Sequence, residues 1–303
     1  MFIVAHVGAL LAVASAGCGS MGGEPAMPGP VATPTPTSMA QLQFPLDAYA
    51  PSLVQNAQEG RLASHLANLC LRRYGLPPLS SVNFSESIEQ SVRTQRYNQT
   101  RRYGLTDRKT AEQYGYGTPK WTEGDTKPQS LDDVPSDILL VLRGSPRGAS
   151  EAHFRGKPVP PGGCSGEAKK IIGFDGDGSH LAEELQATTF QRMQNEPRAQ
   201  AALAQWSQCI KRKGYNYTDP WNAGNGFGAE DGESGPPTTA EIKSAVASVD
   251  CSYAVNLPGA LFAVEADLQN VEIEKNAEAL EKEKKRVESR ARHIQSLVRK
   301  YGG

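Results

Sequence analysis

The sequence predicts a mostly α-helical protein, with an irregular helical domain, long loops, two disulfides and a long C-terminal helix. Apolar residues recur at three- and four-residue spacing in several segments, and glycine or proline ends most of these segments. Four cysteines are spread over the body of the chain. Because hydrophobic residues make up only 38% of the sequence, we expect many polar loops rather than one dense core.

Residues 1–17 form an uncharged, apolar leader that ends in small side chains directly before Cys18. This pattern is typical of a secretory signal peptide, because the apolar run is too short to span a bilayer comfortably. A cysteine directly after the cut is a site for acylation, so Cys18 is the expected lipid attachment residue. The leader departs from the usual form, since the first basic residue of the chain is Arg61 and Ser15 replaces the branched apolar residue of a lipobox.

Residues 18–41 are expected to be the lipidated N-terminus followed by a disordered linker rich in proline and glycine. The mature protein would then stand off the extracellular face of the cell membrane, or be secreted if the anchor is absent. The sequence holds 32 Lys and Arg against 33 Asp and Glu, which gives a net charge of −1. Such a balance provides no long-range attraction for nucleic acid.

Residues 42–259 are expected to form one disulfide-bonded helical domain. Its helices are predicted over residues 51–74, 107–114, 167–172, 180–195, 197–213 and 238–255. Pro197 fits the first turn of its helix, and Thr238 with Glu241 has the spacing of a capping box. The short apolar run 138–142 fits either a strand or a buried helix.

The element Arg72-Arg73-Tyr74-Gly75-Leu76 is repeated residue for residue at 101–105. Cations favour a helix C-terminus and glycine accepts the left-handed cap, so the repeat is interpreted as one capping solution used twice. Residues 156–164 contain three prolines followed by two glycines. The prolines favour an extended strap, and the glycines allow it to turn at Cys164.

Cys70, Cys164, Cys209 and Cys251 are an even set in a chain that we expect to be exported, which favours two disulfides over free thiols. Three connectivities are open to four cysteines. We favour Cys70–Cys164 with Cys209–Cys251, because the second pair joins two neighbouring helical segments. Zinc is the competing interpretation, but no CxxC or paired-histidine spacing supports it.

Residues 260–303 are predicted to form one long C-terminal helix, with apolar residues on alternating four- and three-residue steps. The seam residues are Ile273, Leu280, Val287 and Ile294. Such a seam suits either packing on the domain or a coiled-coil-like contact with a partner protein. The opposite face alternates glutamate with lysine and arginine, which is typical of a solvated helix.

Three aromatic residues follow the helix that ends near Lys213, namely Tyr215, Tyr217 and Trp221. Their alternation offers aromatic faces to a sugar, and it equally suits anchoring of the loop to the core. No catalytic motif of the common extracellular hydrolases is present, so no catalytic residue, metal ligand or cofactor is assigned.

Several segments resemble uncharacterised secreted or lipid-anchored proteins of actinomycete bacteria. They are Phe44 to Tyr49, Cys70 to Gly75, Gly156 to Cys164, Trp206 to Tyr215 and Glu265 to Glu278. The resemblance implies an envelope location and disulfides, but no activity. We therefore expect a non-enzymatic binding or accessory protein that contacts an envelope complex through the C-terminal helix. A module that binds cell-wall polysaccharide and an atypical cell-wall hydrolase are the alternatives.

Overall fold

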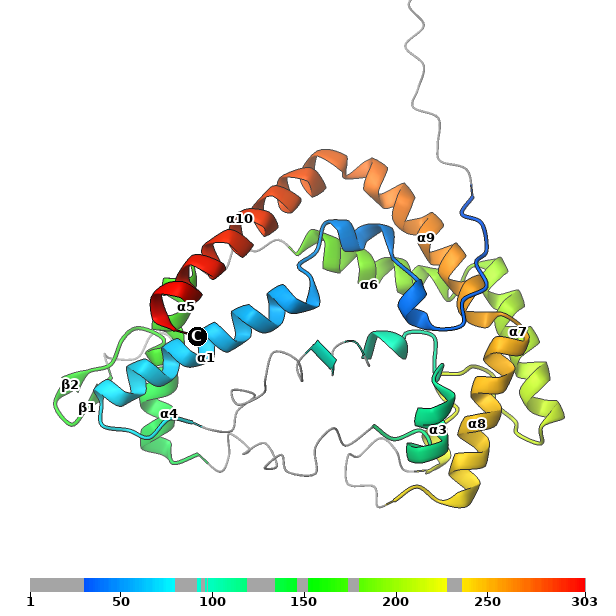
Figure 1. The fold of residues 1–303 in the computed structure, drawn as a ribbon, viewed down its shortest axis with the longest axis horizontal. Helices are drawn as coiled ribbons and strands as arrows, with labels where there is room; N and C mark the ends of the chain where they lie inside the picture. The colour runs from blue at the N-terminus through cyan, green and yellow to red at the C-terminus, as the bar shows by residue number, and fades with distance from the viewer. Residues whose placement is uncertain are drawn as a thin grey trace, which may run out of the picture.

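The computed structural model is mostly helical, as the sequence predicts. It describes residues 30–79, 92–93, 96, 98–118, 134–145, 152–173, 180–227 and 236–302. Within these residues two hydrophobic cores lie at opposite ends of the molecule, and the C-terminal helices run along one edge between them (Figure 1). The leader and Cys18 lie outside the described residues.

The first core belongs to the Cys70 lobe, which takes its name from the disulfide that crosses it. Its helices are α1 (Leu53–Arg73), α4 (Ser136–Arg143) and α5 (Gly163–Ile172), and a two-stranded hairpin of β1 (His153–Phe154) and β2 (Lys157–Pro158) closes one side. Ser52 begins α1 with a full capping box, since its hydroxyl accepts from the Gln55 N–H and the Gln55 side chain accepts from the Ser52 N–H. The apolar run 138–142, which fitted either a strand or a helix, lies within α4 and is helical.

The second core belongs to the Cys209 lobe. Its helices are α3 (Arg108–Tyr114), α7 (Pro197–Arg212), α8 (Thr239–Ala254) and α9 (Leu257–Lys275). Trp206 is fully buried at its centre, where the indole N–H donates to the Ser248 carbonyl over 3.2 Å. A short 3-10 turn, η4 (Asn225–Phe227), packs Phe227 against Tyr116.

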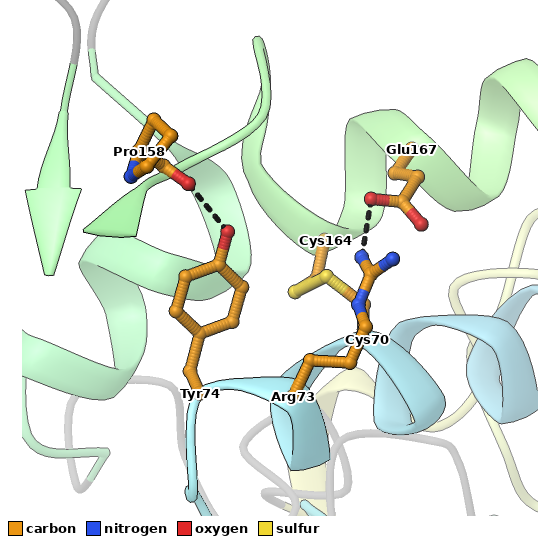
Figure 2. The surroundings of a disulfide bond; sticks show 6 residues. All are labelled: Cys70, Arg73, Tyr74, Pro158, Cys164 and Glu167. Atoms are coloured by element: carbon orange, nitrogen blue, oxygen red, sulfur yellow. Dashed lines mark hydrogen bonds and ion pairs between the residues drawn. A yellow bond between two sulfur atoms is a disulfide. The ribbon is translucent and has the colours of Figure 1, made fainter.

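The cysteine pairing is Cys70–Cys164 and Cys209–Cys251, the connectivity that the sequence analysis favoured. Figure 2 shows the first bridge joining the last turn of α1 to the first turn of α5. The prediction that the strap turns at Cys164 is wrong, because Cys164 lies inside α5. Gly162 and Gly163, both with positive φ, let the helix begin earlier than expected.

In both copies of the repeated element the second arginine pairs with a glutamate of another helix, whereas the tyrosines have different kinds of partner. Arg73 pairs with Glu167 of α5 over 2.5 Å, and Tyr74 donates to the Pro158 carbonyl, as Figure 2 shows. In the second copy, Arg102 and Tyr103 both reach Glu265 of α9. The glycines of both copies, at 75 and 104, have positive φ, which supports the capping interpretation.

The C-terminal region is two helices rather than one of about 40 residues. A long C-terminal helix is confirmed as α10 (Ala277–Tyr301), but Asn276 separates it from α9. The Asn276 side-chain N–H donates to the Glu272 carbonyl over 2.8 Å, which competes with the helical ladder. α9 begins at Leu257, and Leu261 packs in the core of the Cys209 lobe.

The predicted seam faces the rest of the chain. Leu280 is fully buried beside Leu46, Ile273 packs on the same small cluster, and Ile294 lies in the core of the Cys70 lobe. Val287 is half-buried against α1. The seam therefore packs on the rest of the chain.

The described part of the expected linker is packed rather than disordered. We call residues 30–49 the N-terminal arm; it contains the 3-10 turns η1 (Met39–Gln41) and η2 (Pro45–Ala48). The Val31 N–H donates to Asp267 over 2.5 Å, and Asn256 donates to the Pro34 carbonyl over 2.9 Å. The expectation of disorder overlooked these acceptors and donors, because they lie more than 200 residues away in the sequence.

Candidate binding cleft

A buried ion pair lies where the N-terminal arm, α6 (Leu181–Met193) and α9 meet. The Arg102 guanidinium donates to the Glu265 carboxylate through Nε over 3.0 Å and through Nη2. The Glu265 side chain is 0% exposed and that of Arg102 is 27% exposed. The fork-to-carboxylate geometry compensates for the burial of both charges.

Glu265 is held by two further donors. The Tyr103 hydroxyl donates over 2.8 Å and the Gln269 side-chain N–H donates over 3.0 Å. Burial, together with the Glu265 charge, raises the pKa of Tyr103 well above its ordinary value, so its phenol stays protonated and donates. Gln269 also accepts from the Leu46 N–H over 3.1 Å, which ties the arm to this network.

Arg102 lies between two aromatic rings, Phe44 of the arm and Phe190 of α6. Its guanidinium carbon is 5.0 Å from the centre of the Phe44 ring and 4.7 Å from that of Phe190. Nη2 also donates to the Gln186 carbonyl over 3.2 Å. Since Nε and Nη2 are used by the fold, Nη1 is the nitrogen that Arg102 has left for a ligand.

Beside this pair is a cleft of about 710 Å³, within the range of small-molecule sites. The large apolar side chains of its lining are Met39, Leu42, Phe44, Leu53 and Phe190. The polar side chains of the lining are Asp47, Arg96, Asn98, Gln99, Thr100, Arg102, Gln186 and Gln269. The arm, α6 and the segment before Arg102 therefore build one concave site at the junction of the two lobes.

Asp47 is the carboxylate on the described walls of the cleft. It accepts from the Phe44 N–H over 3.1 Å and from the Gln186 side chain over 2.9 Å. Desolvation by partial burial raises the pKa of Asp47, although the hydrogen bond from the Phe44 N–H and the Arg102 charge lower it. Asp47 thus faces the cleft with acceptor capacity remaining.

The aromatic residues proposed as ligand contacts lie elsewhere and are tied to the fold. Tyr215 and Tyr217 stack on each other with ring centres 5.9 Å apart, and the Tyr217 hydroxyl bonds to Ser244 over 3.0 Å. The Trp221 indole N–H donates to the Arg102 carbonyl over 2.9 Å. All three are half-buried against the core of the Cys209 lobe, as the anchoring interpretation predicts.

The described residues hold no cluster of His, Cys, Asp and Glu suited to a metal ion. Within the same residues, no helix has the length and apolar character that a bilayer span requires. Comparison with protein-family models, with curated proteins and with solved structures finds no match for this chain. The chemistry of the cleft therefore has to be derived from its own residues.

Sequence reasoning missed the cleft because Arg102 was interpreted as a helix-end cation. One signal was present: Glu265 is the lone charge within the apolar run 260–266. A carboxylate in such a run requires a buried partner, so its presence predicts an ion pair in the core. The identity of that partner depends on a contact over 163 residues, which no local pattern contains.

Proposed function

We propose that this chain is an exported, lipid-anchored protein of the cell envelope that binds a ligand in the cleft beside Arg102. The apolar leader that ends at Cys18 supports the export and the anchor. Two disulfides support an oxidising compartment, because such bonds are rare where thiols are kept reduced. The actinomycete resemblance is consistent with the same location.

The observation that carries the binding function is the cleft of about 710 Å³, which is lined by Arg102 of the Arg102–Glu265 pair. Binding sites are concave, largely preformed and lined by apolar groups with a few oriented polar ones, and this cleft has each of these properties. We accordingly propose the cleft, rather than the C-terminal helix, as the site where an envelope partner binds. The apolar seam of the C-terminal helix, which we expected to dock a partner, is used by the chain itself.

A cell-wall hydrolase has one observation in its favour, the raised pKa of Asp47 in a cleft. Paired-carboxylate hydrolysis requires a second carboxylate across the substrate. Glu265 does not meet this need, since Arg102, Tyr103 and Gln269 already bind its two oxygens. Binding without turnover is therefore our leading function.

The anchor is tested by expressing the full-length protein in an actinomycete host and separating membranes from medium. We expect wild type in the membrane fraction and Cys18→Ser in the medium. The intact mass of the membrane form should correspond to loss of residues 1–17, added acyl groups and two disulfides. A membrane form that retains Met1 and carries no acyl group would contradict the proposed cleavage and lipid anchor.

A further inference from the structure

Among the described residues, the charges of the cleft balance in number. Arg102 is neutralised by Glu265, and the remaining charged side chains of the lining, Asp47 and the exposed Arg96, are opposite in sign. A strongly anionic ligand would approach Asp47 without an uncompensated cation to pay for its desolvation. A cationic ligand would likewise find no uncompensated carboxylate to offset the cost of its desolvation. The cleft therefore suits a ligand without net charge.

The polar groups on the walls differ in what they offer. Arg102 donates and Asp47 accepts, whereas the amides of Asn98, Gln99 and Gln186 do both. Hydroxyl groups also donate and accept at once, so closely spaced hydroxyls match such a mixed lining. Asn98 and Gln99 are exposed in the structure, which leaves their amides accessible.

Apolar side chains also line the cleft. Leu42, Phe44 and Leu53 are half-buried, so part of each side chain remains accessible. A pyranose ring has hydroxyls around its edge and C–H groups on its faces, so a lining that combines polar and apolar groups accommodates both. The volume of about 710 Å³ exceeds the need of a single small polar metabolite and suits a few linked units.

From the balanced charge, the mixed donors and acceptors and the accessible apolar side chains of the lining, we infer that the cleft binds a neutral oligosaccharide segment. This inference rests on the proposed function, since it names the ligand of the same cleft. A fatty acid or other anionic amphiphile fits less well, because Asp47 lies on the wall. A peptide fits less well because the cleft has no open strand edge along the described residues to pair with its backbone.

Isothermal titration of the purified full-length protein tests the ligand class. The probes are maltotetraose, cellotetraose, mannotetraose and N-acetylchitotetraose, with laurate and a neutral hexapeptide pool as the competing classes. We expect at least one tetrasaccharide to bind and the competing probes not to bind. Pelleting with insoluble wall polymer, with and without the bound tetrasaccharide, separates a polymer ligand from a soluble one.

Matched variants locate the binding. Gln186→Ala removes a wall amide and should weaken the tetrasaccharide at least fivefold, while the exposed Gln191→Ala on the same helix should leave the affinity unchanged. Asp47→Asn keeps an acceptor for the Phe44 N–H and should weaken binding less than Gln186→Ala. Binding of laurate or peptide that Gln186→Ala weakens would overturn the ligand class but leave the cleft as a binding site. Binding of no probe would overturn both the oligosaccharide as ligand and the cleft as binding site.

Discussion

Arg102 and Glu265 meet as a fork and a carboxylate across 163 residues of sequence, and this pair connects the segment before α3 to the middle of α9. The pair also fixes the cleft, since Arg102 lies between Phe44 of the arm and Phe190 of α6. A fully buried carboxylate needs such a partner, because its desolvation is costly. The stability of the Cys209 lobe and the shape of the site thus depend on one contact.

Arg102→Met should destabilise the protein by about 3–5 kcal/mol, because it leaves the Glu265 carboxylate buried without its counter-charge. Arg108→Met is the matched control, since Arg108 pairs with Asp250 at the surface and both side chains are exposed. Urea denaturation followed by circular dichroism measures both. Equal midpoints for the two variants would contradict a structural role for the buried pair.

Gly259→Ala should loosen the N-terminal arm, because the added Cβ would collide with the Pro34 carbonyl oxygen. Overpacking of this kind costs about 1–3 kcal/mol, and the arm rather than the helix is expected to yield. Gly60→Ala in α1 is the control, since nothing lies within 4 Å of its Cβ and alanine favours a helix by about 0.5–1 kcal/mol. Limited proteolysis at residues 30–42 should accelerate in the first variant and not in the second.

The two disulfides should stabilise separate lobes. Cys70 and Cys164 are 94 residues apart and Cys209 and Cys251 are 42 apart, so each double alanine variant is expected to lose about 4 kcal/mol by loop-closure entropy. Hydrogen exchange by mass spectrometry should show α1 and α5 opening first in the Cys70/Cys164 variant, and α7 and α8 in the other. The same opening pattern in both variants would indicate one cooperative unit.

Glu272 links α9 to α6 and gives the protein a defined response to acid. Its hydrogen bond from Arg192, 2.6 Å long, lowers the pKa of Glu272, and the bond from Lys275 adds to the effect. Because the folded-state pKa is lowered, this stabilisation is present above the ordinary glutamate pKa of about 4.3 and is lost as the pH falls through the lowered value. Glu272→Gln should therefore lower the melting temperature at pH 7, with the difference from wild type vanishing in strong acid.

Glu274→Gln supplies the control for this response, since Glu274 is an exposed residue of the same helix. We expect its melting temperature to follow that of wild type from pH 7 to pH 3. A Glu272→Gln difference that is constant over this range would attribute its effect to packing rather than to charge.

Local signals in the sequence were sufficient for most helices. The cap at Ser52, Pro197 in a first turn and the glycines at 75 and 214 are short-range features, and each marks a helix end in the structure. The capping box at Thr238 is only half realised, because the Glu241 carboxylate turns to accept from the Tyr116 N–H over 3.0 Å. Tertiary hydrogen bonds thus override a local pattern where a distant donor is available.

The features that sequence reasoning missed depend on distant partners. The N-terminal arm contains the proline pattern of a linker, and only the contacts to Asp267 and Asn256 make it part of the body. The apolar repeat continues across Asn276, so periodicity alone could not reveal that the helix divides there. The N-terminal arm supplies several residues of the cleft, which explains why no motif indicated it.

Hydrogen exchange of the full-length protein, with and without a solubilised envelope extract, tests the binding cleft most directly. The account predicts added protection in peptides that cover residues 39–53 and 181–193, with little change in peptides from residues 277–301. Protection confined to residues 277–301, with the cleft peptides unchanged, would contradict it and would place the partner on the C-terminal helix.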